Sequence, residues 1–249
     1  RRRAIAMKAA HRIFAKPEDA VRGADVVVLC LPVCRIPVFL RKCRSSLKPG
    51  CVVTDVGSTK EYVVRECERL LAGRPASFVG SHPMAGSDQS GLESADANLY
   101  AGATVIVTPR KGSARAAGCV TRLWKALRAQ VVVMPPAFHD RVVAATSHVP
   151  HLVAGMLVDL ASREGESALK ACGPGFRDAT RIAAGPEDVW LDIVRTNRAA
   201  VSRSLRRLEL TLKDVRRMVD REDTARMRSF LARNRRRRAQ WETGRGETR

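Results

Sequence analysis

Three of the chain's five histidines lie in two short polar blocks, Gly80–Asp88 and Ser147–His151. Histidine can take or give a proton near neutral pH, so these blocks are the first candidates for acid–base chemistry. Glycines and a proline restrict the backbone around His82, while His148 and His151 are three residues apart, on one face of a helix. The blocks predict a proton-transfer site. The alternatives are hydrogen-bonded structural histidines, or a metal site built from the His-x-x-His pair.

The bulk composition is that of a globular protein. The chain has 249 residues, enough for one large domain or two ordinary ones, and 45% of them are hydrophobic. Seven cysteines without a Cys-x-x-Cys pair indicate neither a disulfide framework nor a zinc ribbon, so we expect a cytoplasmic protein with no metal. The longest apolar stretches, such as Val26–Val33, are too short to span a membrane. No secretory signal is visible.

The formal net charge is +20, which by itself suggests a nucleic-acid partner. From Arg195 onward, however, there are 18 basic against 7 acidic residues, so more than half of the excess lies at one end. Aromatic residues make up only 4% of the chain, which leaves few platforms for stacking bases. We therefore expect no nucleic-acid partner, and we interpret residues 222–249, which contain Arg235–Arg238, as a solvated and disordered basic tail.

The first half of the chain predicts an α/β domain over residues 1–137. Its candidate strands are continuous apolar runs, which are typical of parallel strands covered on both faces. The runs are Val26–Leu31, Cys51–Asp55, Ser77–Gly80, Ala103–Val107 and Val131–Met134. Ser58 and Glu61 have the spacing of a capping box, which would start a helix directly after the second run. The pattern indicates a doubly wound, Rossmann-like sheet.

From His139 onward helical periodicity replaces the strand pattern, which predicts an all-helical domain over residues 138–221. Apolar residues recur there at steps of three and four, interrupted once by Arg198. They are Leu191, Val194, Val201, Leu205, Leu208, Leu212, Val215 and Val219. Such a narrow stripe is typical of a helix paired with another long helix. We favour a homodimer; the alternative is a core helix within one subunit.

One expected element is missing. A dinucleotide-binding sheet normally opens with a strand, a Gly-x-Gly-x-x-Gly turn and a helix, and no such glycine pattern precedes Val26. Residues 1–10 resemble the helix that follows the second strand of this fold, and His11–Phe14 resembles its short third strand. We therefore predict an incomplete Rossmann-like domain and negligible cofactor binding by this chain alone.

Four blocks taken in order resemble the prephenate/arogenate dehydrogenase family of tyrosine biosynthesis. They are Asp55–Lys60, Gly80–Ser87, His139–His151 and Gly175–Ala183. The resemblance runs from about His11 to Val219. It implies an oxidoreductase that transfers a hydride from the substrate ring to NAD or NADP while carbon dioxide leaves. It also implies a small-molecule substrate, prephenate or arogenate, and neither the substrate nor the cofactor is decided by the sequence.

The chemistry needs a base at the ring hydroxyl, and His82 fits this role by resemblance and by its place after a strand. Ser58 matches the family serine that hydrogen-bonds the same hydroxyl. Arg181 is the predicted carboxylate anchor, because a guanidinium offers bidentate contacts; the alternative is a buried structural ion pair.

The remaining assignments come from the resemblance. Residues matching substrate-side positions are Ser87, Asp88, Ser147, His148, His151, Asp178 and Trp190, with Asp88 and Asp178 matching partners of Arg181. Residues matching cofactor-side positions are Leu31, Pro32, Val33, Asp55 and Gly57. Pro150 would remove one helical hydrogen bond beside the site. The chain departs from the family at Pro174, where glycine is common.

Two other functions remain open at this point. A catalytically inactive dimerising fragment of this family would explain the missing glycine-rich turn. A basic RNA-binding protein on an α/β scaffold would explain the charge. The four blocks favour the dehydrogenase.

Overall fold

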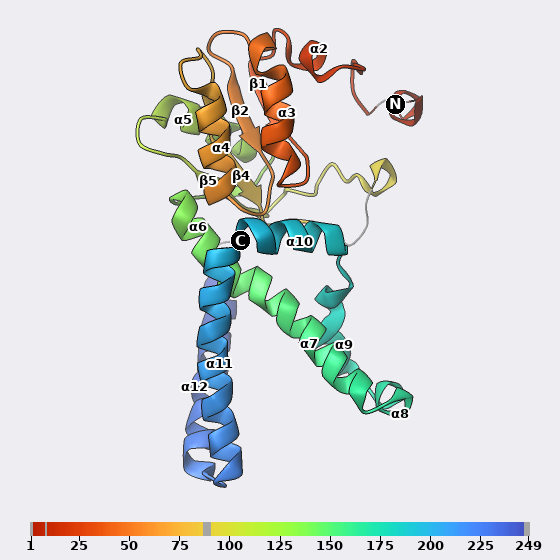
Figure 1. Ribbon diagram of the computed structural model, residues 1–249, viewed down its shortest axis with the longest axis vertical. Helices are drawn as coiled ribbons and strands as arrows, with labels where there is room; N and C mark the ends of the chain where they lie inside the picture. The colour runs from red at the N-terminus through yellow and green to blue at the C-terminus, as the bar shows by residue number, and fades with distance from the viewer. Residues whose placement is uncertain (1, 8, 87–90, 247–249) are drawn as a thin grey trace. The chain divides into compact units, whose positions relative to one another are not determined.

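The computed structural model describes residues 2–7, 9–86 and 91–246. Its contacts divide the chain into two compact units, Arg1–Val201 and Ser202–Arg249, which are described separately. The first unit holds both sheets and most of the helices (Figure 1). The second holds most of one long helix and the whole of another.

The first sheet is parallel, as the apolar runs predict. It has the order β1 (Val26–Leu29), β2 (Val52–Asp55), β3 (Ser77–Phe78), and Leu29 pairs with Asp55 at the carboxyl end. Helices α3 (Arg35–Cys43) and α4 (Glu61–Leu71) pack side by side over one face (Figure 1). Their buried side chains form one core with the strands, including Ile36, Leu40, Val53, Val63 and Phe78.

The second sheet differs from the prediction of an all-parallel arrangement. Its strands are β4 (Gly80–Pro83), β5 (Thr104–Thr108) and β6 (Gln130–Val133); β4 runs antiparallel to β5, and only β5 and β6 are parallel. The expected single strand over 77–80 is divided at Val79 into β3 and β4. Helix α5 (Ala114–Ala126) covers this sheet through Val120 and Trp124.

At the N-terminus the structure has α1 (Arg2–Ala6) and α2 (Pro17–Val21). The expected short strand over His11–Phe14 is wrong, because this segment is irregular. In the described sheet β1 is an edge strand, with β2 as its only strand neighbour.

The helical part of the first unit begins with one continuous run. It comprises α6 (Pro136–Val143), a π-helical turn (Ala144–His148) and α7 (Val149–Arg163). By length and composition alone this run could cross a membrane, which differs from the prediction that no stretch is long enough; the core helix of a soluble protein passes the same test. Three further helices follow, α8 (Glu166–Lys170), α9 (Pro174–Thr180) and α10 (Glu187–Thr196).

The second unit is a helical hairpin formed by α11 (Arg198–Asp220, whose first turn belongs to the first unit) and α12 (Thr224–Gly246). The predicted disorder of residues 222–249 is therefore wrong for Thr224–Gly246. Between Thr224 and Thr243 the segment contains neither Gly nor Pro. It is rich in Arg and also contains Ala, Met and Leu, all of which are good helix formers, so it forms a helix. Arg226 of α12 also donates to Asp214 of α11 at 3.1 Å.

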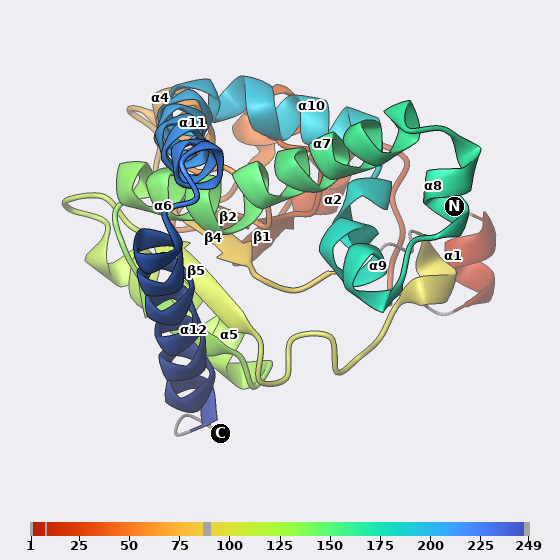
Figure 2. The same cartoon turned by 90° about the horizontal axis from the view of Figure 1, so that it is seen from below.

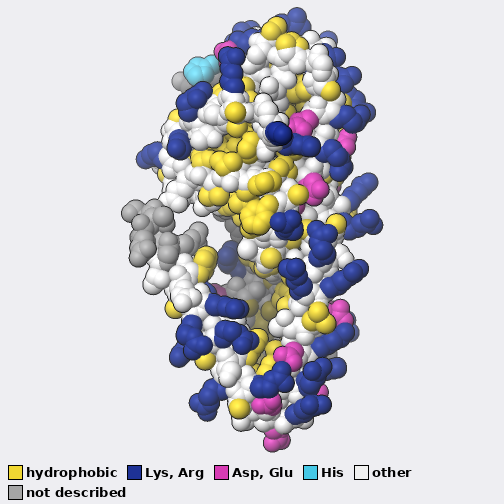
Figure 3. Space-filling model, turned by 90° about the vertical axis from the view of Figure 1, so that its left-hand side faces the viewer, with side chains coloured by type: hydrophobic (Ala, Val, Ile, Leu, Met, Phe, Trp, Pro, Cys, Tyr) yellow, Lys and Arg dark blue, Asp and Glu magenta, His cyan; other side chains and the backbone are white. Residues whose placement is uncertain are grey.

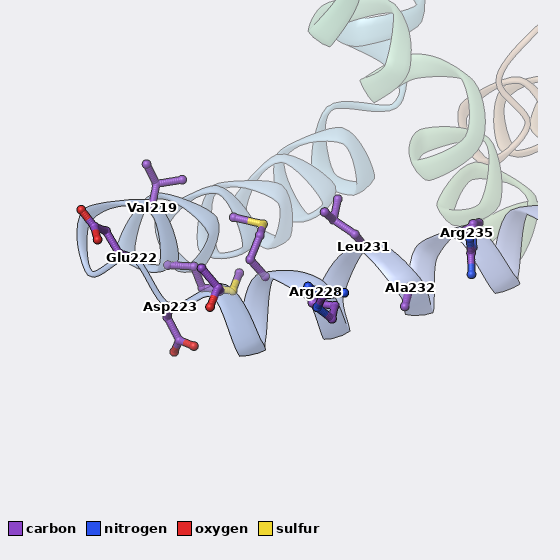
Figure 4. Close-up of a pocket in the computed structure, with 10 residues that line it drawn as sticks. Val219, Glu222, Asp223, Arg228, Leu231, Ala232 and Arg235 are labelled. Carbon is purple, nitrogen blue, oxygen red and sulfur yellow. The ribbon is translucent and has the colours of Figure 1, made fainter.

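The hairpin carries an apolar groove near its turn. Met218 and Val219 of α11 and Met227 and Leu231 of α12 line it, as the close-up in Figure 4 shows in part. Lys and Arg side chains cover the outer sides of both helices (Figure 3). The charge predicted for a disordered end thus lies on an ordered, basic helix.

Candidate active site

A pocket of about 670 Å³ lies in the first unit and collects most of the predicted catalytic and substrate-side residues. From the sheet side it is lined by Ser58, after β2, and His82, in β4. From the helical side it is lined by Ser147 and His148 of the π turn, Arg181 after α9, and Trp190 of α10. In Figure 2 α10 runs alongside α7, and the rings of His148 and Trp190 have centroids 6.2 Å apart.

His82 is a buried, neutral imidazole. It is 8% exposed, and its Nδ1 lies 2.8 Å from Nε2 of His139. Burial lowers the pKa of His82 well below its ordinary value, and the neighbouring His139 and Lys60 lower it further. A histidine kept neutral in this way can accept a proton, as the predicted base requires.

His139 and Asp140 connect this histidine to the start of α4. His139 Nδ1 lies 2.8 Å from Asp140 Oδ1. The Asp140 carboxylate also accepts the backbone N–H groups of Lys60 and Glu61, at 2.7 and 3.0 Å. Asp140 therefore caps α4 from 79–80 residues away along the chain, and the predicted capping role of Ser58 is wrong. The serine side chain makes no cap hydrogen bond because this acceptor occupies the helix end.

Freed from capping, Ser58 lines the pocket together with His82. In the part of the chain that the structure describes, its hydroxyl has no hydrogen-bond partner. A hydroxyl in this state is available to a ligand.

Asp55 has a structural role that differs from the predicted cofactor contact. Its carboxylate is fully buried and forms an ion pair with the equally buried Lys60. It also accepts the backbone N–H groups of Gly57 and Ser81, at 2.9 and 3.1 Å. Lys60 in turn donates to the Ser81 carbonyl at 2.9 Å. This pair joins the end of β2 to β4, and no carboxylate oxygen faces solvent.

The other cofactor-side residues lie at the carboxyl ends of β1 and β2, where ligands bind in doubly wound sheets. Leu31–Val33 connects β1 to α3, and Pro32 is its exposed member. Gly57 lies against it: a side-chain carbon there would lie 2.9 Å from Asp55, 3.0 Å from Ile36 and 3.4 Å from Val33. The turn therefore requires glycine.

On the helical side, His148 is 1% exposed, and burial lowers its pKa to about 4. Its Nδ1 lies 3.2 Å from the Asn197 amide nitrogen, which also donates to the Asp140 carbonyl at 2.8 Å. An amide nitrogen only donates, so Nδ1 of His148 accepts and Nε2 carries the hydrogen. That buried Nε2 has no partner among the described residues, so a hydrogen-bond donor is available at the pocket.

His151 and Trp190 form a stack with ring centroids 3.4 Å apart and an interplanar angle of 12°. Trp190 lines the pocket and His151 does not. His151 thus packs against a residue of the pocket wall, and its direct contact with substrate stays a prediction. Gly185 allows this packing, because a side-chain carbon there would lie 2.4 Å from the indole nitrogen.

Arg181 lines the pocket and is exposed, which contradicts the alternative of a buried ion pair. Asp178 is also exposed and does not line the pocket, and within the described residues no ion pair joins it to Arg181. Pro174 occupies the first turn of α9, where its missing N–H costs no helical hydrogen bond. Ser87 and Asp88 lie outside the described residues.

The structure adds four residues that the sequence did not assign: Lys60, His139, Asp140 and Asn197. Lys60, His139 and Asp140 belong to blocks that carry the resemblance, so their place in these blocks was the available signal. Asn197 lies outside the blocks and acts through tertiary contacts alone. The described residues contain no cluster of three or more His, Cys, Asp or Glu side chains that could hold a metal ion.

Two family models cover nearly the whole chain. The prephenate dehydrogenase nucleotide-binding domain matches residues 2–133, and the prephenate dehydrogenase dimerization domain matches residues 135–233. The chain belongs to the prephenate dehydrogenase family. Its Rossmann-like domain followed by a helical dimerisation domain is the predicted architecture.

Individual relatives support the same family assignment. The cyclohexadienyl dehydrogenase of Zymomonas mobilis is 31% identical over 90% of this chain and 77% of its own length. The prephenate dehydrogenase of Bacillus subtilis is 37% identical over 72% of this chain and 50% of its own length. The chain thus spans about half the length of some curated relatives that it matches.

Among solved structures, the prephenate dehydrogenase of Aquifex aeolicus in complex with hydroxyphenyl propionate and NAD+ superposes with a TM-score of 0.88. It is 31% identical, and the match covers 96% of this chain and 84% of that one. The arogenate dehydrogenase of Synechocystis, at 24% identity, has the same fold with a TM-score of 0.84 over 96% of this chain and 87% of its own.

Proposed function

We propose that this chain carries the catalytic centre of a prephenate or arogenate dehydrogenase. The reaction is the oxidative decarboxylation of prephenate to 4-hydroxyphenylpyruvate, or of arogenate to its amino counterpart, with hydride transfer to NAD or NADP. The supporting observation is the neutral, buried His82 beside the unpartnered Ser58 hydroxyl, in one pocket with Arg181.

Each of these groups has a task that the substrate demands. His82 accepts the proton of the ring hydroxyl as that carbon becomes a carbonyl, and Ser58 orients the hydroxyl. Arg181 binds a substrate carboxylate from the pocket rim. His148 donates a hydrogen bond from Nε2 to a substrate oxygen, because Asn197 fixes its tautomer.

The cofactor would be held at the carboxyl ends of β1 and β2. Backbone groups of Leu31–Val33 and Gly57 meet there beside the start of α3, whose first turn contains no acidic residue. A helix N-terminus without carboxylates suits an anionic ligand. When bound, NAD or NADP supplies the hydride acceptor.

We also infer a homodimer in the cytoplasm, with a small molecule as the other partner. The stripe on α11 predicted to face a second helix is exposed at Leu208, Leu212 and Val219. Met156 and Leu160 of α7 are exposed as well. A second copy would cover these faces, which also explains the apolar character of the run Pro136–Arg163 without a membrane.

The test is steady-state kinetics of the His82→Asn variant with prephenate and with arogenate. The expected result is a fall in kcat of about 10²–10⁴-fold with little change in KM, as is usual for loss of a general base. His11→Asn is the matched control, because His11 is exposed and outside the pocket. A wild-type protein that binds either substrate without turning it over would favour the inactive fragment.

A further inference from the structure

Three buried side chains form a line that ends at the pocket. Asp140 Oδ1 lies 2.8 Å from His139 Nδ1, and His139 Nε2 lies 2.8 Å from His82 Nδ1. The exposed fractions of Asp140, His139 and His82 are 1%, 0% and 8%. The two imidazole rings meet edge to face, with centroids 5.1 Å apart and an interplanar angle of 65°.

The direction of every hydrogen bond in this line follows from its first member. Asp140 accepts two backbone N–H groups at the start of α4, and these groups can only donate. A helix N-terminus favours a negative charge, so the side chain is a carboxylate and His139 Nδ1 donates to it. A neutral imidazole has one N–H, which leaves His139 Nε2 as an acceptor. His82 Nδ1 must therefore donate, and the lone pair of His82 lies on Nε2.

We propose that Asp140 and His139 are positioning residues that hold His82 in the tautomer with a free Nε2 lone pair and stabilise its charge once it has accepted a proton. The inference rests on the proposed function, because it assigns the accepted proton to the substrate hydroxyl. Neither residue touches substrate; both act through His82.

The surroundings of His82 make this arrangement necessary. Lys60, before α4, and His148, in the π turn, both disfavour a positive charge on His82, as does burial. Lys60 is itself paired with Asp55. Asp140 is the carboxylate connected to His82 by hydrogen bonds, through His139, so it stabilises the imidazolium that forms. Burial also lowers the pKa of His139, which keeps the connecting ring neutral before the reaction.

The tautomers can be measured without substrate or cofactor by ¹⁵N–¹H NMR of histidine-labelled protein. The chain has five histidines, so variants that each replace one histidine suffice to assign the NMR signals. The expected result is a proton on Nδ1 of both His82 and His139. A proton on Nε2 of His82 in the folded protein would overturn the proposal.

Two variants at one position separate positioning from packing. In His139→Gln the amide NH₂ can donate to Asp140 and the amide oxygen can accept from His82, so the polarity of the line is kept. In His139→Leu it is lost. We expect His82 to keep its Nδ1 proton in His139→Gln and to become a mixture of tautomers in His139→Leu. Thr196→Val is the control, because it removes a 2.8 Å hydrogen bond to Thr59 without touching the line; its histidine signals should not change.

Kinetics gives an independent readout. His139→Leu should lower kcat by about 10²–10⁴-fold at unchanged KM, whereas His139→Gln should stay within about tenfold of the wild type. Adding Asp140→Ala to His139→Leu should cause little further loss, because the two residues act as one unit. Equal losses in the Gln and Leu variants would overturn the proposal. If the wild type itself is inactive, the NMR result still decides the tautomer, and only the proposed function fails.

Discussion

Lowering the pH from 7 to 5 should destabilise this fold by about 2 kcal/mol at His148 alone. Burial lowers the pKa of His148 to about 4 in the folded protein, whereas an unfolded histidine has a pKa of about 6.5. The unfolded chain therefore binds a proton at pH 5 that the folded protein does not, and unfolding becomes easier as the pH falls. The stabilisation is complete above about pH 6.5 and is lost progressively toward about pH 4.

The pKa values of three more histidines are lowered in the same direction. Burial lowers the pKa of His82, His139 and His151, so each also loses stabilising free energy as the pH falls below the pKa of an unfolded histidine. Since a domain is stable by only about 5–15 kcal/mol, the loss at His148 alone is a sizeable fraction of the total, and the other three histidines add to it. The site that requires neutral histidines is thus the acid-sensitive part of the fold.

The assay is urea unfolding at pH 7 and pH 5, followed by tryptophan fluorescence. His148→Gln removes one titrating group, so its pH-dependent loss of stability should be smaller than that of the wild type by about 2 kcal/mol. His11→Gln, which replaces an exposed histidine, should lose as much as the wild type. If the His148→Gln variant also loses as much, His148 is not held neutral by the fold and the reasoning is refuted.

Three further perturbations test other parts of the argument. Arg181→Ala should raise KM by tenfold or more, which corresponds to about 1.4 kcal/mol of binding, at similar kcat; an unchanged KM would exclude Arg181 as the anchor. Lys60→Met should lower the free energy of unfolding by about 3–5 kcal/mol, because it leaves Asp55 buried without its partner; a loss below about 1 kcal/mol in urea unfolding would contradict this. Leu212→Lys should convert dimer to monomer in sedimentation at micromolar concentration, whereas Thr211→Lys should not; a monomeric wild type would refute the dimer.

Buried strands and pocket histidines could be predicted from sequence because their signals are local. The apolar residues of the Val52–Asp55 strand indicate by themselves that the strand is buried. The glycines and proline around His82 likewise indicate a restricted backbone. Strand direction is different. Nothing in Gly80–Pro83 indicates that it pairs antiparallel with β5, because direction depends on the path of the chain between the two strands.

The capping of α4 shows the same limit at the level of one hydrogen bond. Ser58 and Glu61 have the local spacing of a capping box, yet the helix end takes Asp140 as its acceptor, from a helix of the neighbouring domain. The Asp140 carboxylate carries a full negative charge and accepts two N–H groups at once. It therefore stabilises the helix N-terminus more than the Ser58 hydroxyl would. The order of α12 has a related explanation: a high charge alone does not imply disorder, and the residues of this segment favour a helix.

The π turn connects these observations to the site. Pro150 has no N–H and its ring clashes with the carbonyl four residues earlier, so the turn before it cannot continue as a regular α-helix. A π turn holds one residue more than an α turn, which rotates all later residues by about 100° around the helix axis.

In a regular α-helix, Asp140 and His148 would be separated by about 80° around the axis. The turn at Ala144–His148 brings them onto one side, where the Asn197 amide contacts both. Asp140 thus directs His82 through its carboxylate and, through its carbonyl and Asn197, helps to hold His148. One helical run thereby orients His82, the proton acceptor in β4, and presents His148 to the same pocket as a hydrogen-bond donor.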